Sequence, residues 1–122
     1  MNQLNELLQA NEWASINALT YSLLVKQGAN VAGVWLFGSK ARGDAKIDSD
    51  IDILLVVNKL TPSTRWQIRE LAADCSLEYD VLINTHILDK ERWDTHTYYQ
   101  STLYEEVIRD GICLLESAST LQ

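Results

Sequence analysis

The sequence predicts one α/β (α+β) domain spanning residues 1–122, with a small mixed β-sheet flanked by helices. Three observations lead to this prediction. A chain of 122 residues suits one hydrophobic core rather than two. Its content of 47% hydrophobic and 22% charged residues is ordinary for a globular domain. Short apolar runs typical of buried strands alternate with segments of helical periodicity, which is the pattern of a sheet covered by helices.

The first half of the chain predicts helices, a strand, a short helix and a second strand. Apolar residues recur at helical spacing within residues 1–27, which favours one or two opening helices. Val31–Phe37 is a continuous apolar run and predicts a strand buried on both faces. After a short helix at Ser39–Gly43, the run Asp50–Val57 predicts a second strand. Residues 31–83 would then hold the core strands and the helix between them.

The second half predicts two helices and two strands. Thr61-Pro62-Ser63 is typical of a helix start, and we expect this helix to continue to Leu77. Tyr79–Asn84 predicts the third strand. Asp89 can cap a helix that covers the rest of residues 89–110 and ends at Gly111. Ile112–Leu115 predicts a short last strand, and the tail after it is expected to fray.

Charge and composition exclude several classes of function. The chain has ten basic and seventeen acidic residues, a net charge of −7, and residues 78–122 alone account for −6. Such a balance argues against a surface that gathers nucleic acid or anionic lipid, so we expect neither as a direct partner. With no apolar stretch long enough to cross a bilayer, the expected location is the cytoplasm. Two cysteines, Cys75 and Cys113, predict buried free thiols.

A pair of aspartates at the start of the second strand indicates a metal site. Side chains alternate between the two faces of a strand, so Asp50 and Asp52 should point the same way, about 6–7 Å apart. Two neighbouring carboxylates repel each other unless a cation lies between them. Carboxylate oxygens suit Mg²⁺, which binds a few protein ligands together with substrate phosphates.

The turn that follows the first strand has the composition of a phosphate site. Gly38 lets a phosphate approach the backbone, and the hydroxyl group of Ser39 can donate a hydrogen bond to it. Arg42 and Lys40 are candidates for additional positive charge, although solvated side chains are the alternative for both. The turn and the aspartate pair together predict a site for a metal-bound nucleotide.

A third carboxylate on a neighbouring strand would complete such a site. Asp80 is our first choice, because it begins the expected third strand; Glu78, two residues earlier, is the alternative. A carboxylate beside Asp50 and Asp52 could share a metal ion and accept the proton of an attacking hydroxyl group.

These residues resemble a known family. Gly38-Ser39, ten residues and then Asp50-x-Asp52 are similar to the signature of the minimal nucleotidyltransferases (MNT), within the polymerase-β-like nucleotidyltransferase superfamily. Ala41-Arg42-Gly43 and Ser49 also fit the usual form of that signature. The resemblance implies ATP bound at Gly38, Ser39, Arg42 and Ser49, and two Mg²⁺ ions held by Asp50, Asp52 and Asp80. It also implies transfer of AMP to an acceptor hydroxyl group, with loss of pyrophosphate.

The resemblance further implies a protein partner. MNT proteins are typically antitoxins that AMPylate a tyrosine of a HEPN-domain ribonuclease toxin, and we expect the same class of activity and partner here. One alternative is an antitoxin that only binds its toxin. Another is a small-molecule nucleotidyltransferase completed by a separate helical subunit.

Other conspicuous side chains carry weaker expectations. His86 and His96 lack the spacing of a zinc site. Trp66 and Trp93 are expected either in the core or at an interface. Glu105 and Glu106 belong to the C-terminal acidic excess, for which we expect a face complementary to a basic partner.

Overall fold

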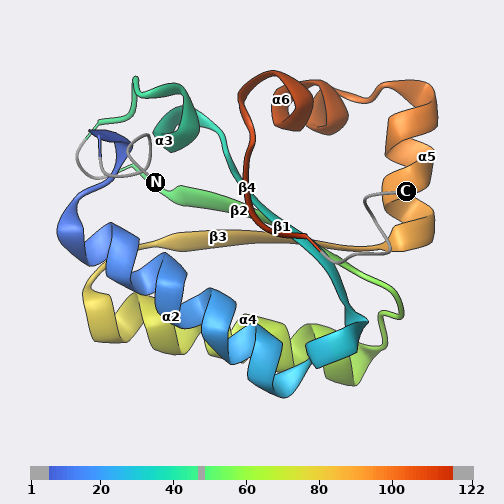
Figure 1. Cartoon of the computed structure of the whole chain (residues 1–122), viewed down its shortest axis with the longest axis horizontal. Helices are drawn as coiled ribbons and strands as arrows, with labels where there is room; N and C mark the ends of the chain where they lie inside the picture. The colour runs from blue at the N-terminus through green and yellow to red at the C-terminus, as the bar shows by residue number, and fades with distance from the viewer. Residues whose placement is uncertain (1–5, 47–48, 117–122) are drawn as a thin grey trace.

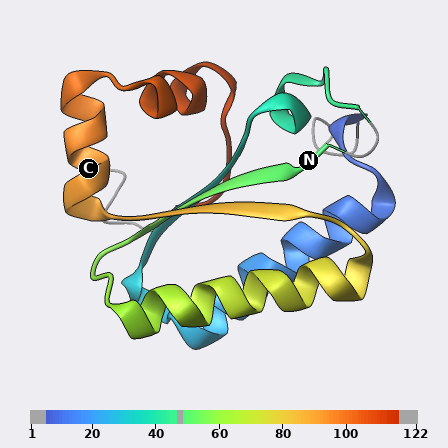
Figure 2. The same ribbon diagram turned by 180° about the vertical axis from the view of Figure 1, so that it is seen from behind.

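The computed structural model describes residues 6–46 and 49–116 and contains one four-stranded sheet with helices on both faces (Figure 1). The strand order is β3-β2-β1-β4. β2 is parallel to β3, whereas β1 is antiparallel to both β2 and β4. Helices α2 and α4 cover one face, and α5 and α6 lie on the other side, as the view from behind also shows (Figure 2). The predicted α/β class is confirmed.

The first half of the chain agrees closely with the sequence prediction. Its elements are α2 (Ala10–Lys26), a 3-10 turn (Gly28–Asn30), β1 (Val31–Phe37), α3 (Ser39–Arg42) and β2 (Ile51–Val57). β1 has the predicted bounds, and six of its seven residues are buried. β2 begins one residue after Asp50, and Ile51 donates its backbone N–H to the carbonyl of Leu82 at 2.8 Å.

The predicted third strand is wrong in its position. α4 spans Pro62–Tyr79, two residues beyond the expected end, and β3 spans Ile83–Asp89. The helix ends because Asp80 adopts the left-handed conformation, with φ 55°, and its backbone N–H bonds to the carbonyl of Ser76. Left-handed residues are common at helix C-termini, and aspartate tolerates this conformation better than most residues do.

The single helix expected over residues 89–110 is also wrong. The segment forms two helices, α5 (Lys90–Tyr99) and α6 (Thr102–Asp110). Gln100 between them is left-handed, with φ 50°, and the hydroxyl oxygen of Ser101 accepts the N–H of Tyr104 to start the next helix. β4 (Ile112–Glu116) follows and confirms the predicted last strand, while the tail expected to fray lies outside the described residues.

The sheet separates two hydrophobic layers. Odd-numbered residues of β2 face α2 and α4, and even-numbered ones face α5 and α6, as strand alternation requires. Members of the larger layer include Ile16, Leu19, Leu23, Leu36, Ile53, Leu55 and Ile68. Members of the smaller layer are Ala32, Phe37, Leu54, Val56 and Val107, packed against Trp35, Leu88, Trp93 and Leu103. Asp52 therefore lies on the side of the smaller layer.

The cysteine prediction is half right. Both thiols are free, but only Cys75 is buried, whereas Cys113 is exposed on the edge strand β4. Partial loss of hydration is the main cause that raises the pKa of each thiol, even at the exposed Cys113, and a neighbouring acid adds to it, Glu78 at Cys75 and Glu116 at Cys113. None of the described helices combines the length and the hydropathy that crossing a membrane requires.

Candidate active site

Pairing of β1 with β2 brings the two halves of the predicted motif together. Phe37 is opposite Asp52 in the register, so the next residue, Gly38, lies against the Asp52 side chain. Gly38 has φ 78° and ψ −158°, a conformation that is essentially restricted to glycine. A Cβ atom on Gly38 would lie 2.3 Å from Oδ2 of Asp52. The carboxylate of Asp52 therefore occupies the space that a Cβ atom on Gly38 would need. Ser39, the next residue, begins α3.

Two side chains of β3 complete the surroundings of Asp52. In the parallel register Asn84 is opposite Asp52, and its Nδ2 donates to Oδ1 of Asp52 at 3.0 Å. His86 lies on the same side, with Nε2 at 3.7 Å from that oxygen and its ring 5.0 Å from the ring of Phe37. The Asp52 side chain is 25% exposed. The sequence analysis missed both partners, although their period-two spacing would identify them once β3 is correctly positioned.

Asp50 and Ser49 lie just before β2. Asp50 is exposed, and strand alternation directs it to the same side as Asp52. Ser49 closes a turn, since its hydroxyl oxygen accepts the N–H of Lys46 at 2.9 Å while its own N–H bonds to the carbonyl of Lys46 at 3.0 Å. These two bonds hold Ser49 close to Lys46, immediately before the aspartate pair.

The two basic residues of α3 make structural contacts. Lys40 is 4% exposed, and its Nζ lies 2.5 Å from Oε2 of the equally buried Glu12 on α2. Arg42 is half exposed, and its guanidinium contacts Asp44 at 3.2 Å and Asp110, at the end of α6, at 3.7 Å. A hydrogen bond from Arg109 is the main cause that lowers the pKa of Asp110, and Arg42 adds to it. These pairs attach α3 to α2 and α6.

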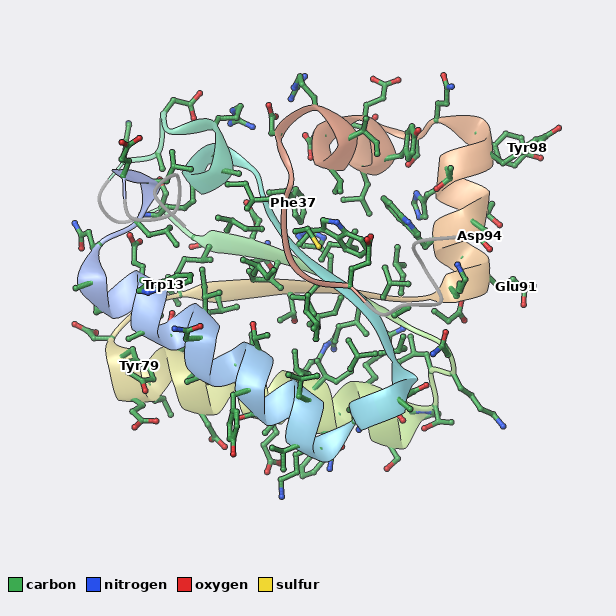
Figure 3. All side chains as sticks on the ribbon, in the orientation of Figure 1. Trp13, Phe37, Tyr79, Glu91, Asp94 and Tyr98 are labelled. Atoms are coloured by element: carbon green, nitrogen blue, oxygen red, sulfur yellow. The ribbon has the colours of Figure 1, made fainter. Side chains whose placement is uncertain are left out.

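The structure does not bring Asp80 or Glu78 onto a strand beside the aspartate pair. Asp80 caps α4 and lines a hollow with Glu12 and Ser76, on the α2/α4 side of the sheet. Asn11 of α2 donates to the carbonyl of Tyr79 at 3.0 Å, which holds the end of α4 against α2. Figure 3 shows Tyr79 on that side and Phe37 on the other. Within residues 6–46 and 49–116, no three acidic, histidine or cysteine side chains cluster closely enough to share a metal ion.

The donors around Asp52 suit a hard divalent cation. Asp50 and Asp52 provide carboxylate oxygens, and the amide of Asn84 can offer its own oxygen if it rotates. Mg²⁺ accepts one or two carboxylates together with substrate phosphates, so this oxygen set fits it without a third acid. A buried strand end, a glycine turn and two carboxylates, one just before the next strand and one on it, form a site suited to metal-assisted phosphate transfer.

The comparison with known families agrees with this class. The sequence model described as "Nucleotidyltransferase domain" matches residues 22–109 of the chain. The matched range includes β1, the Gly38 turn and the aspartate pair, and it covers more than half of the chain. The chain belongs to the nucleotidyltransferase domain family.

Two curated relatives are similar over part of their length. A protein of Methanocaldococcus jannaschii, named as a candidate protein adenylyltransferase, is 43% identical over 58 residues, which cover 47% of this chain and 59% of that protein. A spectinomycin 9-adenylyltransferase of Staphylococcus aureus is 46% identical over 44 residues, which cover 35% of this chain and 17% of that enzyme. The matches thus span less than two thirds of either relative.

Solved structures share the fold. A toxin–antitoxin complex crystallised with AMP-PNP contains a chain with a TM-score of 0.52 at 24% identity, covering 83% of this chain and 73% of that one. A mutant MntA-HpeT toxin–antitoxin complex gives a TM-score of 0.52 at 22% identity, covering 82% and 73%. At these identities the likeness concerns the fold.

Proposed function

We propose that this protein transfers AMP from ATP to a hydroxyl group, with a divalent metal ion held by Asp50 and Asp52. The observation that carries the proposal is the contact between the Gly38 backbone and the Asp52 carboxylate, where a Cβ atom would lie only 2.3 Å from Oδ2. A nucleotide phosphate that approaches the turn therefore also reaches the metal-binding carboxylates. Membership of the nucleotidyltransferase domain family supports the reaction class.

The residues around the turn have distinct roles in this proposal. Ser39 donates its hydroxyl to a phosphate oxygen, and Gly38, which has no Cβ atom, leaves room for the Asp52 carboxylate beside the turn. Arg42 and Ser49 shape the nucleotide site by fixing α3 and the chain before β2. Asp50 and Asp52 would hold Mg²⁺, two ions in the proposal, which would supply positive charge to the phosphates. The acceptor hydroxyl group passes its proton to a carboxylate of the site, and its oxygen attacks the α-phosphorus of ATP. The bond from that phosphorus to the bridging oxygen breaks, and pyrophosphate leaves.

Asp80 stays a prediction for the third carboxylate, and so does its alternative Glu78. In the structure described here, the position opposite Asp52 belongs to Asn84. Asp80 would have to leave its capping position on α4 to share the metal ion. An Asp80→Asn variant tests this role, because asparagine keeps both the left-handed conformation and the backbone N–H that end α4. Loss of transfer with unchanged thermal stability would support a metal ligand, whereas unchanged transfer would contradict it.

We propose a tyrosine of a HEPN-domain toxin as the acceptor. The sequence resemblance to MNT antitoxins supports this partner, and toxin–antitoxin complexes are among the structures that share the fold. The similar protein of M. jannaschii, named as a candidate protein adenylyltransferase, supports a protein acceptor. In this proposal AMP transfer neutralises the toxin.

Mass spectrometry of the partner toxin after incubation with ATP and Mg²⁺ tests the proposal. We expect the toxin to gain one or more AMP units on tyrosine, and the Asp50→Asn/Asp52→Asn double variant to give none. Glu91→Gln, on the exposed surface of α5, is the matched acidic control and should retain full transfer (Figure 3). An unmodified toxin under these conditions would contradict catalysis, and protection of cells by the double variant would instead favour an antitoxin that acts by binding.

A second candidate function, AMP transfer to a small molecule, is supported by one observation. The 46% identity to a spectinomycin adenylyltransferase over 44 residues favours transfer of AMP to a small-molecule hydroxyl group, with a separate helical subunit supplying the acceptor site. Incubation with ATP, spectinomycin and a co-expressed helical partner separates the two candidates. Adenylylated drug with an unmodified partner would favour this second function.

A further inference from the structure

A second hollow lies at the opposite end of the sheet from the candidate active site. It has a volume of about 510 Å³ and lies between the first turns of α4 and α5. Its lining includes Arg65, Trp66 and Arg69 of α4, together with Asp89 and Arg92 at the start of α5. Ligand pockets for small molecules commonly measure about 300–1,000 Å³. The hollow is therefore large enough for a compound the size of a mononucleotide.

Three arginines around this hollow have no acidic partner among the described residues. Within 4.0 Å, the ion pairs in residues 6–46 and 49–116 involve other side chains than Arg65, Arg69 and Arg92. Arg65 only approaches the carbonyl of Ile87, at 3.5 Å. All three guanidinium groups line one hollow, where the only acid among the described lining residues is Asp89. They provide a local positive field on an acidic protein.

The single acid in the lining is already engaged. One carboxylate oxygen of Asp89 accepts the backbone N–H of Arg92 at 2.7 Å and caps α5. Lys90, the neighbouring cation on the same turn, pairs with Asp94 at 3.8 Å and is not part of the lining. The positive charge of the hollow thus comes from the three arginines, with Asp89 as the one opposing charge.

An exposed indole provides the apolar part of the hollow. Trp66 is 67% exposed although tryptophan is usually well buried. It precedes Arg69 by one helical turn on α4, so the indole and that guanidinium lie on the same helix face. An aromatic face beside guanidinium groups can stack a flat heterocycle while the cations bind its phosphate.

This hollow is distinct from the site at Asp52. Asp52 is the second residue of β2, which ends at Val57, and α4 begins five residues after the strand ends. At about 3.3 Å per residue, the five residues from Asp52 to Val57 separate the two ends of the strand by about 17 Å. A ligand in one site would not touch the residues of the other.

We propose that the hollow between α4 and α5 is a second nucleotide site, which binds a nucleoside monophosphate without a metal ion. The base stacks on Trp66, and the phosphate lies among Arg65, Arg69 and Arg92. The proposal does not depend on the transfer reaction, because none of these residues belongs to the candidate active site.

Calorimetric titration of the full chain with AMP, in buffer that contains EDTA, tests the proposal. EDTA removes the divalent ions on which nucleotide binding at Asp50 and Asp52 depends. We expect saturable binding of AMP, and a shift of the Trp66 indole N–H signal in a ¹⁵N NMR spectrum, assigned with Trp66→Phe. The Asp50→Asn/Asp52→Asn variant should bind AMP with unchanged affinity.

Matched variants identify the residues that bind. Arg92→Gln should weaken AMP binding at least tenfold, and Arg69→Gln should do the same. Lys90→Gln is the control, because Lys90 lies on the same turn of α5 but already pairs with Asp94. This variant should change the affinity for AMP less than twofold. Equal melting temperatures of Arg92→Gln and Lys90→Gln show that the fold is intact in both.

Four results of these experiments, and a fifth from a peptide titration, would overturn the proposal. They are the absence of AMP binding at millimolar concentration, an unmoved Trp66 signal, equal effects of Arg92→Gln and Lys90→Gln, and inorganic phosphate binding as tightly as AMP. The last result would indicate a site for bare anions. A short polyglutamate peptide that binds more tightly than AMP would also contradict the proposal, because it would indicate a docking site for an acidic protein segment.

Discussion

The buried ion pair between Lys40 and Glu12 decides whether the basic residue after Gly38-Ser39 acts on phosphate or on the fold. Both side chains are about 95% buried, with Nζ 2.5 Å from Oε2, and Glu12 also accepts the N–H of Gln9 at 2.8 Å. Lys40→Met removes the cation and leaves the buried Glu12 carboxylate without its counter-charge. The structure thus predicts a loss of stability from a residue adjacent to the phosphate turn.

The size of the loss follows from the burial of the pair. Breaking a buried ion pair by removing one partner typically costs about 3–5 kcal/mol, because the remaining charge is uncompensated. A domain of this length has about 6–18 kcal/mol of total stability, so Lys40→Met should fold but unfold at a clearly lower denaturant concentration. The double variant Lys40→Met/Glu12→Gln has no uncompensated carboxylate, and its glutamine side chain at position 12 can still accept the backbone N–H of Gln9. We therefore expect the double variant to lose only about 1–2 kcal/mol of stability relative to the wild type.

Urea unfolding of the wild type, Lys40→Met, Glu12→Gln and the double variant measures this coupling as a double-mutant cycle. Binding of ATP with Mg²⁺ to the same four proteins then separates the two roles. If Lys40 only joins α3 to α2, the double variant regains ATP affinity together with stability. A double variant as unstable as Lys40→Met, or a stable one that cannot bind ATP, would refute the structural interpretation of Lys40.

Three further predictions concern the site and the thiols. Gly38→Ala should lower stability by about 1–3 kcal/mol, because alanine is strained in the backbone conformation of Gly38. It should also reduce AMP transfer more than a hundredfold, because the new Cβ atom displaces the carboxylate of Asp52. Retention of transfer, measured by mass spectrometry, would contradict this prediction. Asn84→Asp should raise the affinity for Mn²⁺ several-fold in a paramagnetic titration, since a third carboxylate then lies beside Asp52, and an unchanged affinity would exclude the β3 position from the metal site. Cys113 should react slowly with a thiol reagent at pH 7 and faster as the pH rises, because its raised pKa keeps the thiol protonated, whereas Cys75 should react only on unfolding; equal rates for the two would contradict the burial of Cys75.

Local sequence chemistry was enough to predict the part of the fold that holds the motif. β1 is a continuous apolar run, and its bounds follow from Gly28 before it and Gly38 after it. The short helix after Gly38 and the start of β2 beside Asp50 follow from the same local signals. Because Gly38 and Asp52 are neighbours across one antiparallel pair, the contact between them depends on few other elements.

The two wrong predictions, the position of the third strand and the single C-terminal helix, both occur where a left-handed residue other than glycine ends a helix. Asp80 and Gln100 both have positive φ, and neither residue type is a strong signal for that conformation in a sequence. Because α4 ends only at Asp80, β3 begins later in the sequence than expected, and Asn84 rather than an acid lies opposite Asp52. The stop at Gln100 divides one expected helix in two. In both cases packing against the rest of the domain, which sequence periodicity does not describe, determines where the helix ends.

The antiparallel pairing of β1 with both β2 and β4 has a consequence for the order of folding. Thirteen residues separate the end of β1 from the start of β2, whereas seventy-four separate it from the start of β4. Loop-closure entropy grows with the logarithm of loop length, so pairing β1 with β4 costs about 1.5 kcal/mol more than pairing it with β2. We expect amide hydrogen exchange to show β4 opening while β1 and β2 stay paired, so that the Gly38–Asp52 contact survives the first step of unfolding.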